Sequence, residues 1–243
     1  MDFNYDDCTS RAQRGGRLYQ LRVADLHPTQ CGVGLDEVNA KADSMRKKSK
    51  EELTAYLITH PVPIVIGNGD KFYLTDHHHL ARALWEVASG KNEAGIDESN
   101  ARVAVEVLYN WSVLKDYSFW KAMHDNSWVY LFDHMGGGPL PPDALPKHIK
   151  DLRNDPYRGL AWYVRTAFGY DKMPADFAEF QWAQFFRMRM ILDNRLLRNQ
   201  IEDTDILLAK MSDEDRQAII DEAVHLASSS AAAGLPGYVG RGG

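Results

Sequence analysis

The chain has few cysteines and no long apolar run, and each shortage excludes a class of protein. Only Cys8 and Cys31 occur among its 243 residues, so a disulfide framework is not expected and a reducing cytoplasm is the simplest location. No apolar run approaches the roughly 20 residues that a membrane-spanning helix needs. The polar residues 1–16 do not resemble a secretory signal. We therefore expect a soluble, cytoplasmic protein with no membrane partner.

A surplus of positive charge is also missing. The chain has 28 Lys and Arg against 34 Asp and Glu, which gives a formal net charge of −6. General nucleic-acid binders need a basic face that neutralises many phosphates, and we find no helix-turn-helix pattern. The basic run at 46–50 is more simply explained as a solvated helix face. A nucleic-acid partner is therefore not expected, although local basic patches leave the alternative open.

The composition otherwise predicts a packed α+β protein. Hydrophobic residues make up 44% of the chain, which is enough for a sizeable core. Residues 17–110 alternate strand-like and helix-like segments, and residues 111–227 are helical and rich in aromatic side chains. We expect a flexible N-terminus at 1–16 and a disordered tail, rich in Ser, Ala and Gly, at 228–243. The expected strands lie at 18–23, 62–66, 72–74 and 101–109, and the expected helices at 36–56, 77–88, 118–125, 146–151, 157–168, 175–197 and 213–227.

The densest group of chemically active side chains lies at residues 75–79, which read Thr-Asp-His-His-His. This motif follows a predicted hairpin at 62–74, whose Asn-Gly and Gly-Asp pairs favour a tight turn, and it precedes a helix-forming stretch. We therefore expect Asp76 or Thr75 to be the N-cap, with the three histidines in the first turn. Such a turn presents unpaired backbone N–H groups and the positive end of the helix dipole, which suit a phosphate group.

Plainer explanations of this motif stay open. Asp76 can serve only as a helix cap, which is worth about 0.5–2 kcal/mol. Consecutive histidines point about 100° apart on a helix, so at most two of His77, His78 and His79 can converge on one site. Metal ligands on one helix face need i and i+4 spacing, so we predict no metal site here. A histidine with its usual pKa of about 6.5 can instead exchange a proton beside a bound phosphate.

Several segments carry a resemblance to a known superfamily. Residues 72–84, which read FYLTDHHHLARAL, are similar to the strand-to-helix motif of the ParB/sulfiredoxin superfamily, usually Asp-Gly-His-His-Arg or Gly-x-x-Arg. Residues 26–41 resemble the first box of its ParB-like nuclease branch, and residues 155–165 and 177–183 resemble the helical extension of that branch. The resemblance spans residues 17–198. It implies a small mixed sheet in the N-terminal half and an aromatic-rich helical C-terminal half.

The resemblance also implies a phosphate site at the start of the helix that follows the motif. Activities in the superfamily include CTP hydrolysis, ATP-dependent reduction of sulfinic acids and phosphorylation of free serine. Asp76 matches the motif aspartate, and His78 and His79 match the two histidines, whereas His77 replaces the usual glycine. Leu80 stands where the motif arginine would be, and its absence removes a fixed, bidentate cation. Arg82, one turn after the histidines, could supply that charge.

Four further charged residues are candidates for the site. In the free-serine kinases an early glutamate activates the substrate hydroxyl, and Glu37 is the nearest acid here, with Gln30 in an alternative register. Glu37 could instead only favour a helix start and pair with Lys41. Arg158 and Arg165 interrupt aromatic segments of the helical half. Either the helical half is a lid over the phosphate site, and one of these arginines binds the ligand, or both arginines form buried ion pairs with a purely structural role.

Three functions follow from these observations. The leading one is a phosphotransferase or nucleotide hydrolase, in which Asp76, His78, His79 and Glu37 are the catalytic candidates and Mg²⁺ accompanies a bound nucleotide. In this function phosphate would be bound by Thr75, His77, Arg82, Lys41, Arg158 and Arg165. The second is a metal-dependent phosphodiesterase or nuclease, although a convincing acidic triad is missing. The third is a non-catalytic module that binds a small anion. Sulfiredoxin chemistry is excluded, because it needs a cysteine beside the motif.

Overall fold

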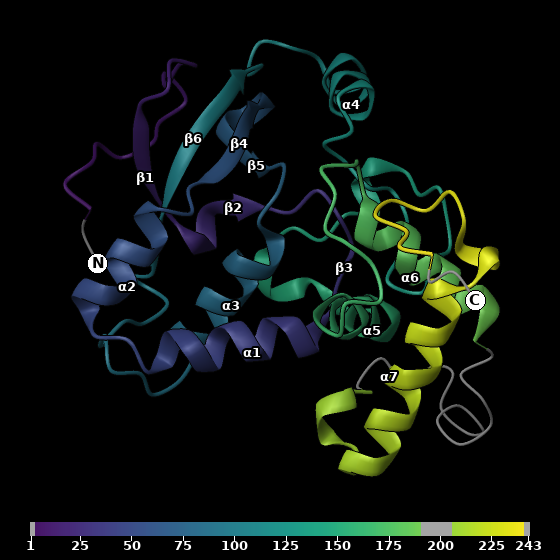
Figure 1. The fold of residues 1–243 in the computed structure, drawn as a ribbon. Helices are drawn as coiled ribbons and strands as arrows, with labels where there is room; N and C mark the ends of the chain where they lie inside the picture. The colour runs from purple at the N-terminus through teal and green to yellow at the C-terminus, as the bar shows by residue number, and fades with distance from the viewer. Residues whose placement is uncertain (1–2, 191–205, 241–243) are drawn as a thin grey trace. The chain divides into compact units, whose positions relative to one another are not determined.

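The computed structural model describes residues 3–190 and 206–240, and these divide into two compact units (Figure 1). The first unit takes in the described residues of Met1–Cys31, Val38–Asp133 and Gly137–Leu152. The second takes in the described residues of Gly32–Glu37, His134–Gly136 and Arg153–Gly243. The sequence placed the division near residue 110, whereas the structure places the main division after Leu152.

A mixed five-stranded sheet forms the centre of the first unit. Its strand order is β1 (Leu18–Arg22), β6 (Arg102–Asn110), β4 (Val62–Gly67), β5 (Lys71–Leu74) and β2 (Leu26–His27). Strands β1 and β6 are antiparallel, as are β4 and β5, whereas β4 runs parallel to β6 and β2 runs parallel to β5. The apolar, β-branched sequence of β4 suits its place in the middle of the sheet, where nearly all of its side chains are buried.

The helices of the first unit begin with α1 (Leu35–Arg46), whose first three residues belong to the second unit, and continue with α2 (Lys50–Ile58), α3 (His78–Ala88) and α4 (Asp116–Asp125). A capping box starts α2, because the Ser49 side chain accepts from the Glu52 N–H and the Glu52 carboxylate accepts from the Ser49 N–H. Helix α3 buries the apolar stripe of Leu80, Leu84 and Val87 that the sequence predicted. The predicted α+β class is therefore confirmed.

Residues 111–133 and 137–152 belong to the same unit as the sheet, so the division does not fall at residue 110. Phe119 and Met123 of α4 share a buried cluster with Val65 of β4 and with Cys31. Half-buried aromatic side chains surround this cluster, and Tyr73 of β5 lies 5.0 Å from Phe119 between ring centroids. The aromatic residues that follow β6 thus complete the core of the first unit.

The N-terminal segment lies along the sheet for much of its length. The backbone N–H of Cys8 donates to the Gln20 carbonyl at 2.8 Å, and the Gln20 N–H donates to the Asp6 carbonyl at 2.9 Å. Phe3 and Cys8 are buried. This part of residues 1–16, for which the sequence predicted flexibility, therefore extends the sheet beside β1.

The second unit is built from three longer helices and a short parallel strand pair. Its elements are β3 (Gly32–Val33), β7 (Arg153–Asn154), α5 (Pro156–Thr166), α6 (Ala178–Arg189) and α7 (Asp213–Ser228). Asp155 caps α5 by accepting from the N–H groups of Tyr157 and Arg158, and Pro156 occupies the first helical position.

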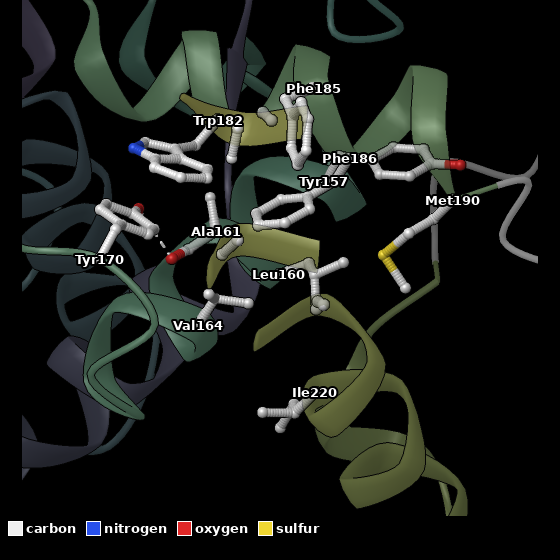
Figure 2. Close-up of a cluster of buried hydrophobic side chains, with 14 of the residues drawn as sticks. Tyr157, Leu160, Ala161, Val164, Tyr170, Trp182, Phe185, Phe186, Met190 and Ile220 are labelled. Carbon is white, nitrogen blue, oxygen red and sulfur yellow. Dashed lines mark hydrogen bonds between the residues drawn. The ribbon is translucent and has the colours of Figure 1, made fainter. Parts of the chain in front are cut away.

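Aromatic side chains dominate the core of the second unit (Figure 2). Trp182 and Phe186 of α6 are fully buried against Leu160 of α5, and the rings of Trp182 and Tyr170 stack at 4.3 Å between centroids. Ile220 of α7 closes the cluster from another helix. The predicted aromatic-rich helical C-terminal part is confirmed.

The tail is ordered to residue 240, which differs from the predicted disorder at 228–243. Ala232 is buried in the core of the second unit, Tyr238 pairs with Tyr170 through a β-bridge, and the Pro236 carbonyl accepts from Trp182 Nε1 at 2.8 Å. Burial of these apolar side chains outweighs the weak local propensity of a Ser- and Ala-rich sequence. Residues 241–243 lie outside the described part.

The remaining helical segments are short 3-10 turns: η1 (Val23–Asp25), η2 (Asn68–Asp70), η3 (Pro142–Ala144), η4 (Ile149–Asp151), η5 (Leu208–Lys210) and η6 (Ser230–Ala232). The helix expected at 146–151 is thus only the single turn η4. The helix expected at 175–197 is α6, and the rest of that prediction from residue 191 lies outside the described residues. Within the described ranges, no helix is both long and apolar enough to cross a membrane.

Candidate functional site

The predicted motif lies at the turn from β5 into α3, one residue later than expected. His77, not Asp76 or Thr75, is the N-cap of α3, and it adopts a left-handed backbone conformation with φ 65° and ψ 24°. The Oδ1 atom of the exposed Asp76 accepts from the His77 N–H at 2.6 Å, so the carboxylate caps the turn before the helix. The expectation that Asp76 or Thr75 is the N-cap was wrong, because the left-handed residue delays the helix by one position.

Thr75 is attached to the neighbouring strand. Its backbone N–H donates to the Pro63 carbonyl of β4 at 3.0 Å, and its hydroxyl lies 3.4 Å from the same oxygen. The threonine is half-buried. The backbone of Thr75 thus continues the β4–β5 pairing by one residue.

His78 points into the core of the first unit. Its Nε2 atom accepts from the backbone N–H of Thr29 at 3.0 Å, and the Thr29 hydroxyl donates to the Leu74 carbonyl at 2.7 Å. Burial lowers the pKa of His78 well below its usual value, and the neighbouring His79 and His77 lower that pKa further. Because Nε2 is an acceptor, the ring is neutral and carries its proton on Nδ1. His78 therefore links the residues after β2 to the first turn of α3.

His77 and His79 are both half-buried, so each retains some contact with solvent. His79 lies within the first turn of α3, and His77 precedes that turn. Of the three histidines, these two combine partial exposure with a place at the helix start.

Arg82 is engaged within the first unit. Its Nε lies 2.8 Å from the Glu86 carboxylate, one turn along α3, and its Nη1 donates to the Leu152 carbonyl at 2.5 Å. The side chain is 13% exposed. Arg82, the cation expected to compensate for Leu80, is thus already paired with a carboxylate.

The other predicted cation of the first unit, Lys41, lies on α1 and is half-buried.

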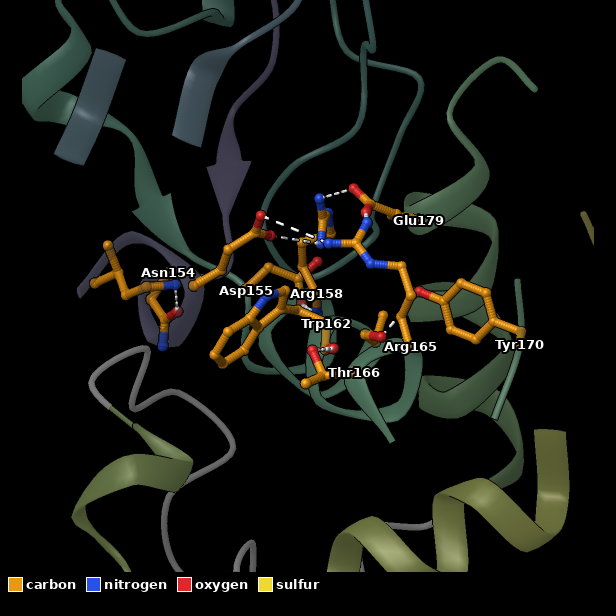
Figure 3. Close-up of polar contacts among 11 residues, drawn as sticks. Asn154, Asp155, Arg158, Trp162, Arg165, Thr166, Tyr170 and Glu179 are labelled. Carbon is orange, nitrogen blue, oxygen red and sulfur yellow. Dashed lines mark hydrogen bonds and ion pairs between the residues drawn. The ribbon is translucent and has the colours of Figure 1, made fainter. Parts of the chain in front are cut away.

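Glu37 comes together in the second unit with Arg158, Arg165 and Glu179 of α6. The last three are labelled in Figure 3. We refer to these four residues as the arginine–glutamate cluster. Glu37 lies 3.3 Å from Arg158 and 3.8 Å from Arg165, and Glu179 pairs with both arginines. Arg158 and Arg165 are seven residues apart on α5, which places them on one helix face. The sequence predicted Glu37 and both arginines as candidates but did not place Glu179 among them.

Two buried aspartates of the second unit were also absent from the predicted site. Asp155 forms an ion pair with Arg187 at 2.7 Å, and burial raises the pKa of Asp155 while Arg187 opposes that rise. Asp36 accepts from the backbone N–H groups of Leu208 and Ala209 at 3.1 and 2.8 Å, and burial raises its pKa. An aspartate directly before a proline signals a helix cap and could have identified Asp155. No sequence pattern near Asp36 predicts that its partners are Leu208 and Ala209.

The structure therefore distributes the predicted site residues over both units. Thr75 to His79, Lys41 and Arg82 lie in the first unit, and Glu37, Arg158 and Arg165 lie in the second. Within residues 3–190 and 206–240, no group of three or more His, Cys, Asp or Glu side chains is arranged to hold a metal ion.

Comparisons with known proteins agree with this architecture. Residues 19–188 match the model of a family described as "Putative ParB-like nuclease". The crystal structure of protein Atu1540 from Agrobacterium tumefaciens is similar to this chain, with 34% sequence identity and a TM-score of 0.72. The match covers 93% of this chain and 99% of the Agrobacterium chain. No curated protein matches the sequence.

Proposed function

The chain belongs to the ParB-like nuclease family, and from this premise we propose that it binds a nucleotide or another phosphate-bearing small molecule at the start of α3 and catalyses phosphoryl transfer or hydrolysis there. The proposal concerns Asp76, His77 and His79 of the first unit. One observation carries it: the N-cap residue His77 makes no side-chain capping hydrogen bond, and no acidic residue lies within the first turn of α3.

A helix start without an acidic residue in its first turn favours an anion for two reasons. The first N–H groups of a helix have no carbonyl partner within the helix, and the helix dipole places partial positive charge at the same end. A glutamate or aspartate in the turn would compete with a ligand for that charge, and α3 has none there. Phosphate groups bind in this way at other helix starts.

The three histidines have different roles in this proposal. His79 is the candidate that donates or accepts a proton at the bound phosphate, because it lies in the first turn and is half-buried. His78 is a positioning residue, because its buried ring accepts from Thr29 and holds the start of α3 against the segment after β2. His77 supplies the left-handed turn that delays the helix.

The donor set at this turn fits a Mg²⁺ ion that arrives with a nucleotide. Asp76 offers one exposed carboxylate, and Mg²⁺ in nucleotide sites is held by one or two carboxylates together with substrate phosphates and water. When bound, the ion would offset negative charge on the phosphate oxygens. Asp76 would bind the ion while its other role, the hydrogen bond to His77, fixes the turn.

Charge at the site limits how tightly a triphosphate should bind. The superfamily arginine is replaced by the buried Leu80, and Arg82 is paired with Glu86 and Leu152. Backbone N–H groups, a histidine and the ion would therefore carry most of the interaction. We expect nucleotide binding to depend strongly on Mg²⁺.

Thermal denaturation with ligands tests the proposal. ATP, ADP or CTP, each with and without Mg²⁺, should raise the unfolding temperature, because a ligand at 100 times its Kd adds about 2.7 kcal/mol of stability. Asp76→Ala and His79→Ala should remove this shift, while His124→Ala, which changes an exposed histidine of α4 in the same unit, should keep it. A shift that persists in both site variants, or its absence with every ligand, contradicts the proposal.

The family description favours a second candidate, a metal-dependent phosphodiesterase or nuclease. Incubation of single- and double-stranded DNA with Mg²⁺ or Mn²⁺ tests it directly. Cleavage that disappears in Asp76→Ala but not in His124→Ala would favour this activity over nucleotide hydrolysis. Cleavage that survives Asp76→Ala would place it outside the proposed site.

A further inference from the structure

The arginine–glutamate cluster has an inner and an outer pair that differ in access to solvent. The side chains of Arg158 and Glu37 are 4% and 6% exposed, whereas those of Arg165 and Glu179 are 19% and 25% exposed. Removal of Glu37 would leave buried positive charge without its partner, which is costly. Glu179, in contrast, already contacts solvent, so water can replace its arginine partners around the carboxylate. The two carboxylates are thus unequal: Glu37 is fixed, and Glu179 is replaceable.

Glu37 orients both guanidinium groups for an acceptor at the Glu179 position. Its Oε2 lies 3.3 Å from Arg158 Nη1 and its Oε1 lies 3.8 Å from Arg165 Nη2. The other terminal nitrogens, Arg158 Nη2 and Arg165 Nη1, both pair with Glu179 (Figure 3). Two guanidinium donors from one face of α5 therefore meet at a single carboxylate. This arrangement is the one that binds planar or tetrahedral oxyanions in proteins.

The donors of Arg158 are not all used by its carboxylate partners. Its Nε is buried and has no hydrogen-bond partner among the described residues. A buried, unsatisfied N–H of a charged group costs free energy that an additional acceptor would recover. A carboxylate has two oxygen atoms, whereas a phosphate has up to four and can reach more than two donors at once.

Glu179 also lies where an anion is electrostatically favoured. It is in the first turn of α6, after Phe177, which adopts a left-handed conformation with φ 53° and provides no side-chain cap. The helix dipole stabilises the Glu179 carboxylate, and it would stabilise any anion that took the same place.

We propose that Arg158 and Arg165 form a binding site for phosphate or a small phosphate ester, and that Glu179 occupies this site when the ligand is absent. The ligand takes the place of the Glu179 carboxylate, which turns out to solvent, and Glu37 stays as the fixed support of both arginines. This inference goes beyond the function proposed for α3, because it uses only residues of the second unit.

Glu179→Gln is the decisive variant, because it keeps the side-chain size and removes the competing charge. Inorganic phosphate is the probe, and isothermal titration calorimetry measures its affinity. We expect the variant to bind phosphate about tenfold more tightly than the wild type, since a competing charged hydrogen bond worth about 1.4 kcal/mol is removed. Arg165→Gln in the same background should abolish the binding. Glu222→Gln, an exposed glutamate of α7, is the matched control and should behave as the wild type.

A second measurement guards against a variant that does not fold. The Nε–H resonances of Arg158 and Arg165 in the ¹⁵N-labelled wild-type chain should shift during titration with inorganic phosphate, and acetate should shift them less. A folded Glu179→Gln protein that gains no affinity overturns the proposal, as does the absence of any arginine shift in the wild type. Equal responses to acetate and phosphate overturn the preference for a tetrahedral anion.

The two proposed sites can fail separately. Asp76→Ala and His79→Ala should remove the nucleotide-dependent thermal shift but leave the phosphate affinity of the Glu179→Gln background unchanged. Arg165→Gln should have the opposite pattern. If Asp76→Ala and His79→Ala instead remove the phosphate affinity of the Glu179→Gln background, the proposal for the arginine–glutamate cluster is wrong.

Discussion

His78 Nε2 accepts a hydrogen bond from the backbone N–H of Thr29 at 3.0 Å inside the first unit. Thr29 is itself buried, and its hydroxyl bonds to the Leu74 carbonyl at the end of β5. The residue pair is 49 positions apart in sequence and connects the segment after β2 with the start of α3. A histidine that the sequence suggests as a proton-transfer group is therefore a structural acceptor.

Replacement of His78 by alanine should destabilise the protein by about 1–3 kcal/mol, because the buried Thr29 N–H loses its acceptor. A cavity left by the ring adds to this loss. Urea denaturation followed by circular dichroism measures the change. His124→Ala, which alters an exposed side chain of α4, should change the free energy of unfolding by less than about 0.5 kcal/mol. Equal stabilities for the two variants would show that the Thr29 contact contributes nothing.

The stability contributed by His78 should depend on pH in one direction. Burial lowers its folded-state pKa well below the unfolded value of about 6.5, so below this pH the unfolded chain binds a proton that the folded chain does not. Stability is therefore fully present above about pH 6.5 and falls as the pH drops toward the folded-state pKa, by at most about 1.4 kcal/mol per pH unit. His78→Gln, which retains an acceptor, should lose stability less steeply between pH 7 and pH 5. An unchanged slope would mean that His78 is protonated in the folded state.

The backbone at His77 gives a third prediction. A left-handed conformation costs a non-glycine residue roughly 1 kcal/mol, and glycine adopts it without that cost. His77→Gly should therefore stabilise the protein by about 0.5–1 kcal/mol in thermal or urea denaturation. It also restores the glycine that is usual in the ParB/sulfiredoxin motif. A loss of stability would indicate that contacts of the His77 ring outweigh the relief of backbone strain.

Gly34, the residue after β3, lies so close to α5 that it should not tolerate a side chain. A Cβ built at Gly34 would lie 2.7 Å from the backbone nitrogen of Gly159 and 2.8 Å from its Cα. Because the neighbour is backbone, it cannot rotate away, and Gly34→Ala should cost about 1–3 kcal/mol. Gly90→Ala is the control, since its Cβ would meet only the Glu86 carbonyl at 3.8 Å. Comparable melting temperatures for the two alanine variants would contradict this account.

The ion pair between Asp155 and Arg187 supports a fifth prediction. Asp155→Ala removes the cap of α5 and leaves the half-buried Arg187 without its carboxylate, so about 3–5 kcal/mol should be lost. Asp155→Asn keeps a capping oxygen and should lose less. Chemical denaturation of both variants separates the cap from the charge. The test is which variant loses more free energy of unfolding. A larger loss in Asp155→Asn than in Asp155→Ala would contradict the prediction.

The sequence predicted a helix, strand or turn correctly where the local residue pattern was clear. The Asn-Gly turn at 68–69 joins β4 to β5, and Gly69 has the positive φ of 69° that such a turn uses. The apolar stripe of α3 was also predicted correctly, and the charged helical stretch predicted at 36–56 is the pair of helices α1 and α2. These features depend on neighbours within a few residues, which is why the sequence sufficed.

Features that depend on distant partners were not predictable in the same way. Helical spacing from Leu80 and Leu84 places position 77 on the buried stripe, but the left-handed conformation of His77 breaks this phase and His78 is buried instead. The partner of His78, Thr29, is recognisable only in three dimensions. In contrast, Arg82 and Glu86 are four residues apart on a helix, a spacing that predicts their ion pair from the sequence.

The hydrogen bonds of Asp36 have a consequence for synthesis of the chain. Asp36 is 172 residues before Leu208 and 173 before Ala209, and β3 is paired with β7 across about half of the chain. Ribosomes release the N-terminal part first, so the partners of Asp36 do not exist until more than 170 further residues have been synthesised. Contacts of such long sequence separation also slow folding. The second unit is therefore expected to complete its folding later in synthesis than the first unit, most of whose strands can pair before Leu208 and Ala209 are made.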